Sequence, residues 1–261
     1  MIYAAFIVWF FVLIFAGIGV YYIASRLIGP RGVSWLFLPG TVISEMAWIL
    51  GSLLTGGEVR RTKLIQSDGA GHHAEGAEST GGLKRIGPLV SAMFAVAACS
   101  AVVVLLDRWL GQSVLKTFTL KGIWVPQDTL PQSLPASWDG FWTFLSAQPK
   151  LMRRLCETFG DLTWSQWQTP AFIYLSICLT VRLAPARRNL RATLGAVVVL
   201  CGLLAILGAI WNNFAGSIQD LWPLLTYMYA LALTLLVAVL LVWAAISLVR
   251  ALAGKLQPAT D

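Results

Sequence analysis

One carboxylate stands inside an apolar stretch of this sequence. Glu45 lies in the pentad Ser44-Glu45-Met46-Ala47-Trp48, within the run 34–56. An ionisable side chain inside a membrane helix is costly, about 2.5–3.5 kcal/mol for Asp, Lys or Arg on insertion scales, and by default marks a functional site. Proton transfer is one interpretation of Glu45. We favour the other, a structural carboxyl that is protonated by desolvation or hydrogen-bonded to Ser44 or Asn189.

The composition of the chain places this run in a membrane. Of the 261 residues, 57% are hydrophobic and 12% are charged, whereas soluble domains have about 25% charged residues. Runs of about 20 apolar residues are long enough to cross the hydrocarbon core. The sequence therefore predicts an all-α polytopic membrane protein, with about six transmembrane helices at 2–25, 34–56, 88–107, 169–184, 193–211 and 221–249.

Two polar stretches interrupt the predicted spans. The loop at 57–87 contains EVRRTKLI at 58–65, which alternates like a short strand, and continues as a glycine-rich segment. The stretch at 108–168 is predicted to be an extramembrane or interfacial insert. This gives a membrane core at 1–107, the insert at 108–168, and a second membrane core with three helices at 169–261.

The insert contains a predicted amphipathic helix that starts at Pro149. Its apolar side chains share one face, as in helices that lie on a membrane surface or against a partner: Leu151, Met152, Leu155 and Phe159. We expect this face to bind another membrane protein or complex. Packing on the chain's own spans is the alternative. Four tryptophans, of a type enriched at interfaces, flank the helix: Trp138, Trp142, Trp164 and Trp167.

The distribution of basic residues predicts the orientation. Cytoplasmic loops of membrane proteins are enriched in Lys and Arg. The hairpin at 182–191 and the loop at 57–87 are basic, whereas the short loop at 212–220 has no basic residue. We therefore expect an integral protein of a bacterial inner membrane with both termini in the cytoplasm. The net charge of +7 is explained by the Lys and Arg residues at the ends of the predicted spans. The sequence shows no soluble module with a basic face, so we expect no nucleic-acid partner.

Two stretches together resemble a known enzyme family. PGTVISEMAWILGSLLTGGEVRRTKL, at 39–64, resembles the core helix of site-2-protease-like intramembrane zinc metallopeptidases, where H-E-x-x-H follows a similar opening. SICLTVRLAPARRNLRATLG, at 176–195, is similar to the A-P-S-x-x-D-x-x-G region that supplies the third zinc ligand. The order of the parts matches as well. The resemblance extends over about 1–107 and 169–215 and omits the insert at 108–168.

The resemblance implies zinc ligands at Ser44, Trp48 and Asn189, and a general base at Glu45. Two histidines at i and i+4 share a helix face and bind Zn²⁺ at about 2.0–2.1 Å, while the glutamate activates water. A serine hydroxyl is a poor ligand, an indole offers only an N–H donor, and a neutral amide binds zinc weakly. We therefore expect a degenerate site without metal, cofactor or catalytic residues.

Other residues offer a weak replacement for these ligands. His72 and His73 are adjacent in the glycine-rich loop, near Glu75 and Glu78. A solvated polar loop is the simpler interpretation, because neighbouring residues rarely present both rings to one tetrahedral ion. The four cysteines form no C-x-x-C and are interpreted as small buried side chains.

These observations favour a non-catalytic membrane scaffold, binding or regulatory subunit, a pseudoprotease that keeps an intramembrane metallopeptidase fold. Two alternatives stay open. One is an active membrane metallopeptidase with an atypical site, which its zinc content would reveal. The other is a small accessory subunit of a transporter or an energy-converting membrane complex. A proton path would need more intramembrane charge than Glu45 provides. The lipid bilayer is a partner in every case.

Overall fold

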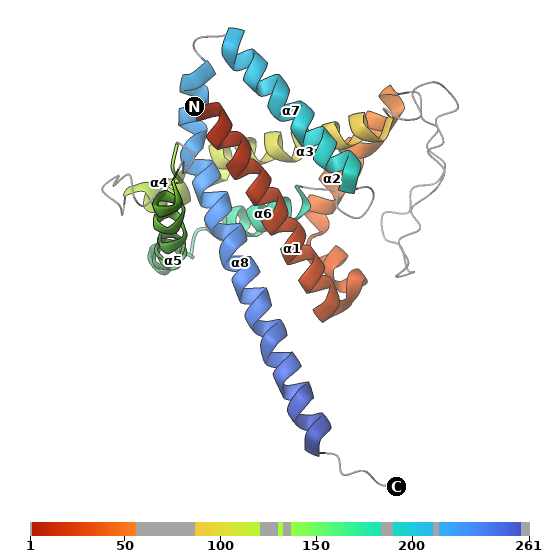
Figure 1. The fold of residues 1–261 in the computed structure, drawn as a ribbon, viewed down its shortest axis with the longest axis vertical. Helices are drawn as coiled ribbons and strands as arrows, with labels where there is room; N and C mark the ends of the chain where they lie inside the picture. Colours follow the sequence, from red (N-terminus) through yellow and green to blue (C-terminus); the bar gives the residue numbers. More distant parts are fainter. Residues whose placement is uncertain are drawn as a thin grey trace.

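The structure, a computed structural model, describes residues 2–55, 87–120, 130–132, 137–183, 190–210 and 214–256. Within these ranges every regular element is helical, so the predicted all-α class is confirmed there. The strand predicted at 58–65 lies outside the described residues. In chain order the helices (Figure 1) are α1 (Ile2–Leu36), α2 (Leu38–Leu54), α3 (Gly87–Leu106), the π-helical turn η1 (Asp107–Gly111), α4 (Gln112–Leu120), α5 (Trp138–Asp161), α6 (Gln168–Arg182), α7 (Leu190–Ile210) and α8 (Phe214–Leu256).

Three helical stretches are long and apolar enough to cross a membrane: Ile2–Leu36, Gly87–Thr119 and Ile218–Ala251. Two shorter apolar helices, Leu38–Leu54 and Ala192–Ile206, accompany them. Helix α6 has 15 residues and is therefore about 22 Å long at 1.5 Å per residue, shorter than the hydrocarbon core of about 30 Å. By length and composition, the structure thus supports a multi-pass membrane protein with three long spans.

The third predicted span does not end at residue 107. Helix α3 continues through η1 into α4, so the first part of the predicted insert extends a membrane-length helix. Gly111 lies where η1 meets α6, and a Cβ there would come within 2.6 Å of the Phe172 ring. The absence of a side chain at Gly111 therefore lets Phe172 pack fully into the core.

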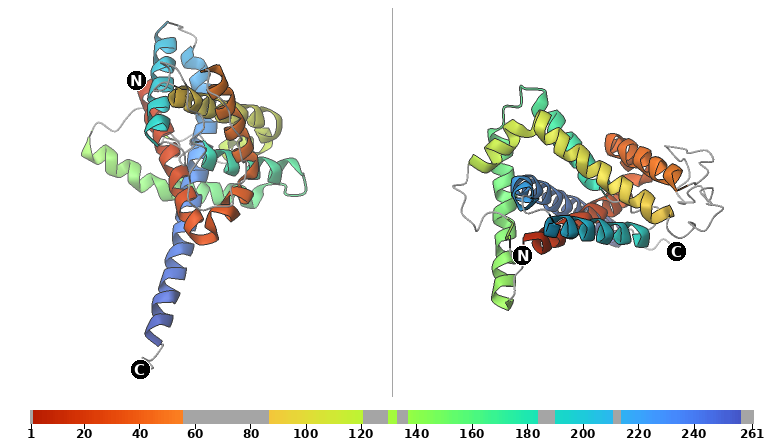
Figure 2. Two further views of the ribbon diagram at one scale, coloured as in Figure 1. Left: turned by 90° about the vertical axis from the view of Figure 1, so that its right-hand side faces the viewer. Right: turned by 90° about the horizontal axis from the view of Figure 1, so that it is seen from above.

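Helices α1 and α8 lie side by side and start near the same end of the molecule (Figure 1). Their first halves supply much of the core, including the fully buried side chains of Ile14, Trp222 and Tyr227. The indole of Trp222 donates to the Leu130 carbonyl at 2.9 Å, which ties the segment 130–132 to α8. The second half of α8 projects beyond the other helices (Figures 1 and 2), with its apolar side chains exposed.

Helix α6 lies against both α1 and α2 at unusually short range. A Cβ added at Gly17 of α1 would come within 2.7 Å of the Thr180 carbonyl oxygen, and one added at Gly40 of α2 would collide with the carbonyl group of Cys178. Small residues allow helix backbones to approach closely in membrane bundles. Tyr174 adds a hydrogen bond to the Leu36 carbonyl at 2.9 Å. Together these contacts fix the position of α6 relative to the start of α2.

Helix α1 bends at Gly29, whose φ of +82° lies in the left-handed region where residues with a side chain are strained. Pro30 follows directly. The bend ends the long first segment of α1 and turns the chain so that α2 starts two residues after Leu36. A glycine is required at this point because the chain must reverse into the helix that carries Glu45.

Helix α5 starts earlier than its predicted start at Pro149. Its N-cap is Ser137, whose hydroxyl accepts the backbone N–H of Gly140 at 3.1 Å. A serine side chain at this position satisfies one of the free N–H groups of the first turn. Pro149 lies inside the helix. The prediction used Pro149 as a start signal and overlooked the stronger cap twelve residues upstream.

Candidate functional site

The pentad with Glu45 lies in the middle of α2, as the sequence predicts. Ser44 is buried and Glu45 and Trp48 are half-buried, whereas Met46 points outward with 56% of its surface exposed. Residues four apart share one face of a helix, and this places Ser44 and Trp48 above one another. One side of the turn therefore faces the bundle, and the other side faces its surroundings.

Ser44 meets side chains from two other helices. Its hydroxyl hydrogen-bonds the thiol of Cys99 on α3, and that thiol lies within the electrostatic reach of Arg182 on α6. The Cys99 sulfur lies 3.9 Å from the backbone carbonyl oxygen of Arg182. We call Ser44, Cys99 and Arg182 the three-helix polar cluster. It assembles because α2 packs on both α3 and α6.

Arg182, the last residue of α6, is half-buried between helices. Its Nε and Nη2 atoms are buried, and its guanidinium carbon lies 4.7 Å from the centre of the Tyr21 ring on α1. A cation over an aromatic face is attracted by the ring quadrupole, and more strongly where water is excluded.

Of the three zinc-ligand positions that the resemblance implies, the structure describes Ser44 and Trp48. Asn189 and the candidates for a replacement site, His72, His73, Glu75 and Glu78, lie outside the described residues. Among the residues that the structure describes, no group of three or more His, Cys, Asp and Glu side chains could hold a metal ion.

The side chains present at the cluster do not suit a divalent cation. Ser44 supplies a hydroxyl and Trp48 supplies an indole N–H donor, so neither position offers a lone pair that competes for zinc. The buried guanidinium of Arg182 adds a positive charge beside Ser44 and Cys99. Two positive charges repel strongly in a medium of low dielectric constant. The interactions at this place are a hydrogen bond between Ser44 and Cys99 and the electrostatic interaction of Cys99 with Arg182.

The predicted partner-binding face of α5 is largely internal. Leu151 and Leu155 belong to the core, and Phe159 packs against it, half-buried like Met152. Helix α5 contacts α4 and α8, and Arg154 on its flank donates to the Phe118 carbonyl at 3.2 Å. The expectation that this stripe forms an exposed binding surface is therefore wrong for Leu151 and Leu155. Both residues pack on the chain's own helices, as the alternative interpretation expected.

An exposed aromatic surface lies at the other end of the same helix. We call it the α5 aromatic surface; it consists of Trp138, Phe141, Trp142 and Leu145, which are 42–70% exposed. The Trp138 ring stacks on Phe141 at 5.7 Å and meets Trp142 edge-on at 5.6 Å between centroids. Figure 2 shows α5 projecting from the bundle. The sequence contains the helical spacing i, i+3, i+4, i+7 for these four side chains. They lie before Pro149, the expected start of the helix.

Comparisons with models of known protein families, with curated proteins and with solved structures find no match for this chain.

Truncation of two leucines on α5 should separate its internal face from its exposed surface. Leu155 is completely buried, whereas Leu145 is 44% exposed. Leu155→Ala should lower the free energy of unfolding by about 2–5 kcal/mol, the usual range for a buried leucine. Leu145→Ala should leave stability almost unchanged. Thermal or denaturant unfolding of the purified chain in detergent measures both. Equal effects of the two variants would contradict the described packing of α5.

Proposed function

We propose that this chain is a non-catalytic scaffold, binding or regulatory subunit of a membrane complex that keeps the fold of intramembrane metallopeptidases. One observation carries the proposal: the guanidinium of Arg182, whose Nε and Nη2 atoms are buried, interacts electrostatically with Cys99, and Cys99 is hydrogen-bonded to Ser44 on the helix that resembles the zinc-binding helix of those enzymes. A metalloenzyme with its metal ion at this position of α2 would need side chains with lone pairs to bind the ion. It would also need neighbouring side chains that are neutral or negatively charged.

Electrostatics supports this proposal. The positive charge of Arg182 would repel a divalent ion bound near it, and like charges repel more strongly in a medium of low dielectric constant. A serine hydroxyl cannot offset such a repulsion, because its oxygen carries no formal charge. Glu45 remains on α2 as one half-buried carboxylate, too few ligands for a tetrahedral zinc site.

The proposed topology has six membrane helices in a bacterial inner membrane. The three long spans supply half of them, and the apolar helices Leu38–Leu54 and Ala192–Ile206 and the short helix α6 supply the others. The basic residues of the hairpin at 182–191 and of the C-terminal end favour the cytoplasmic side for both. The expected cytoplasmic N-terminus disagrees with the packing, because α1 and α8 start near the same end of the molecule and run in the same direction (Figure 1).

The α5 aromatic surface is the proposed place of contact with a second membrane protein. Large exposed apolar patches on a folded protein mark interaction sites, and tryptophan is enriched among the residues that dominate binding energy. Trp138 and Trp142 are 70% and 51% exposed and already touch each other. A partner would therefore meet a partly pre-organised surface.

The zinc content of the purified chain tests the non-catalytic proposal. We expect far less than one equivalent of zinc per chain by elemental mass spectrometry after equilibration with micromolar zinc. Restoring the ligands through Ser44→His, Trp48→His and Asn189→Asp should give weak binding, because the charge of Arg182 remains.

Adding Arg182→Leu to that triple variant should tighten zinc binding at least tenfold, about 1.4 kcal/mol. Arg250→Leu, which removes an exposed positive charge from the end of α8, is the matched control and should have no such effect. One equivalent of zinc on the unmodified chain, lost in Glu45→Gln, would refute the proposal and favour an atypical metallopeptidase.

Copurification in mild detergent tests the proposed contact surface. The double variant Trp138→Ala, Trp142→Ala should lose a stoichiometric membrane protein partner at least tenfold while the chain stays folded. Trp109→Ala removes an equally exposed tryptophan, 82% exposed, from η1 and should retain the partner. Retention of the partner by the double variant would exclude the α5 aromatic surface as its binding site.

A further inference from the structure

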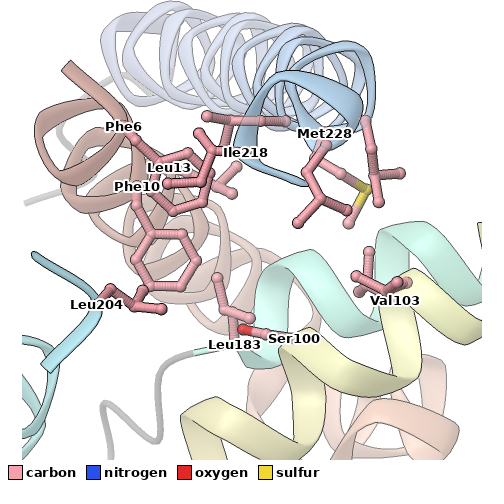
Figure 3. A pocket seen from close by; sticks show the side chains of 13 residues that line it. Phe6, Phe10, Leu13, Ser100, Val103, Leu183, Leu204, Ile218 and Met228 are labelled. Atoms are coloured by element: carbon pink, nitrogen blue, oxygen red, sulfur yellow. The ribbon is translucent and has the colours of Figure 1, made fainter. Parts of the chain in front are cut away.

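An apolar pocket of about 270 Å³ lies between the long helices. Figure 3 shows side chains from α1, α3, α7 and α8 around it. Most of its lining consists of aliphatic and aromatic groups, represented by Phe6, Phe10, Val103, Leu204, Leu224 and Met228. All three stretches that are long and apolar enough to cross a membrane contribute to its wall. The medium around this pocket in a bilayer is therefore hydrocarbon.

The pocket lies near the starts of α1 and α8. Its lining residues on these helices lie at 6–13 and 218–228. At 1.5 Å per residue these lie within about 20 Å of the helix starts. A lipid beside this end of the two helices could insert an acyl chain between them.

The volume decides which occupant fits. A helix is about 10 Å across and rises 5.4 Å per turn, so one turn needs more than about 400 Å³ and cannot enter. A methylene group is similar in size to a water molecule, whose share of liquid volume is about 30 Å³. The pocket therefore has room for a chain of roughly nine carbons. An acyl chain in this space would gain van der Waals contacts with the apolar wall.

One polar group sets this pocket apart from a plain apolar groove. The Ser100 side chain is part of the lining (Figure 3), and its hydroxyl oxygen is buried without a hydrogen-bond partner among the described residues. Other helical hydroxyls in this chain donate to the carbonyl four residues earlier, as Ser91 does at 3.0 Å and Thr226 at 2.9 Å. A buried hydroxyl left unpaired costs about 1–3 kcal/mol. Ser100 therefore has a donor available for an acceptor in the pocket.

We propose that this pocket binds one acyl chain of a membrane phospholipid, with the Ser100 hydroxyl donating to an ester oxygen of that lipid. The apolar wall holds the first eight to ten carbons, which is about the volume available. The oxygen of the ester provides the acceptor that the helix itself does not give to Ser100. This site borders the three-helix polar cluster through Ser100 and Leu183, the neighbours of Cys99 and Arg182, and does not depend on the proposed scaffold function.

Photochemical labelling in nanodiscs tests the site. The full chain is embedded in phosphatidylethanolamine and phosphatidylglycerol that carry a diazirine on one acyl chain, and the labelled peptides are identified by mass spectrometry. We expect label to concentrate on 6–13 and 218–228 at least fivefold over the exposed stretch 240–249. Equal labelling of the three stretches in the unmodified chain would overturn the proposal, whatever any variant does.

Two substitutions sharpen the test. Val103→Phe fills the pocket and should remove the excess labelling, whereas Leu241→Phe makes the same kind of change on the exposed half of α8 and should preserve it. Ser100→Ala removes the donor with little loss of volume and should lower the labelling severalfold. Full labelling in Val103→Phe would overturn the site, and full labelling in Ser100→Ala would overturn the hydrogen bond. A second copy of the chain filling the pocket would give a dimer without lipid label, which also overturns it.

Discussion

The close approach of the α6 backbone to α1 and α2 is the contact on which the centre of this structure depends. Gly17 and Gly40 have no side chain to hold these helices apart from the carbonyl groups of Thr180 and Cys178. Because α6 is so near, the side chain of Arg182 at its end is enclosed and rests on Tyr21. A pair of glycines thus determines where a positive charge is buried.

That buried charge links the packing to the proposed function. Arg182 and the pentad helix α2 are linked through Cys99, which is hydrogen-bonded to Ser44 and interacts electrostatically with Arg182. The proposed non-catalytic function depends on this positive charge, because it would repel a metal ion bound nearby. The apolar pocket borders this cluster through Ser100 and Leu183, whereas the α5 aromatic surface lies on a helix that contacts α4 and α8.

Local patterns in the sequence predicted part of this arrangement. The i, i+4 spacing of Ser44 and Trp48 placed them on one face of α2, and the apolar runs predicted the long spans. The stripe containing Leu151 and Leu155 was recognised, but amphipathic periodicity does not say whether a stripe faces a partner or the chain's own bundle. The burial of Arg182 depends on glycines more than 140 residues away, a tertiary contact that no local pattern contains.

The proximity of Ser44 and Cys99 gives the most direct measurement of the central claim. Ser44→Cys, in a chain with Cys156, Cys178 and Cys201 replaced by alanine, places two thiols at neighbouring positions of α2 and α3. Mild oxidation should join residues 44 and 99 in a disulfide within one chain, identified as a linked peptide by mass spectrometry. The same substitution at the outward-facing Met46 should give no link. Absence of the 44–99 link, or an equal link from position 46, would contradict the meeting of α2, α3 and α6 around Arg182.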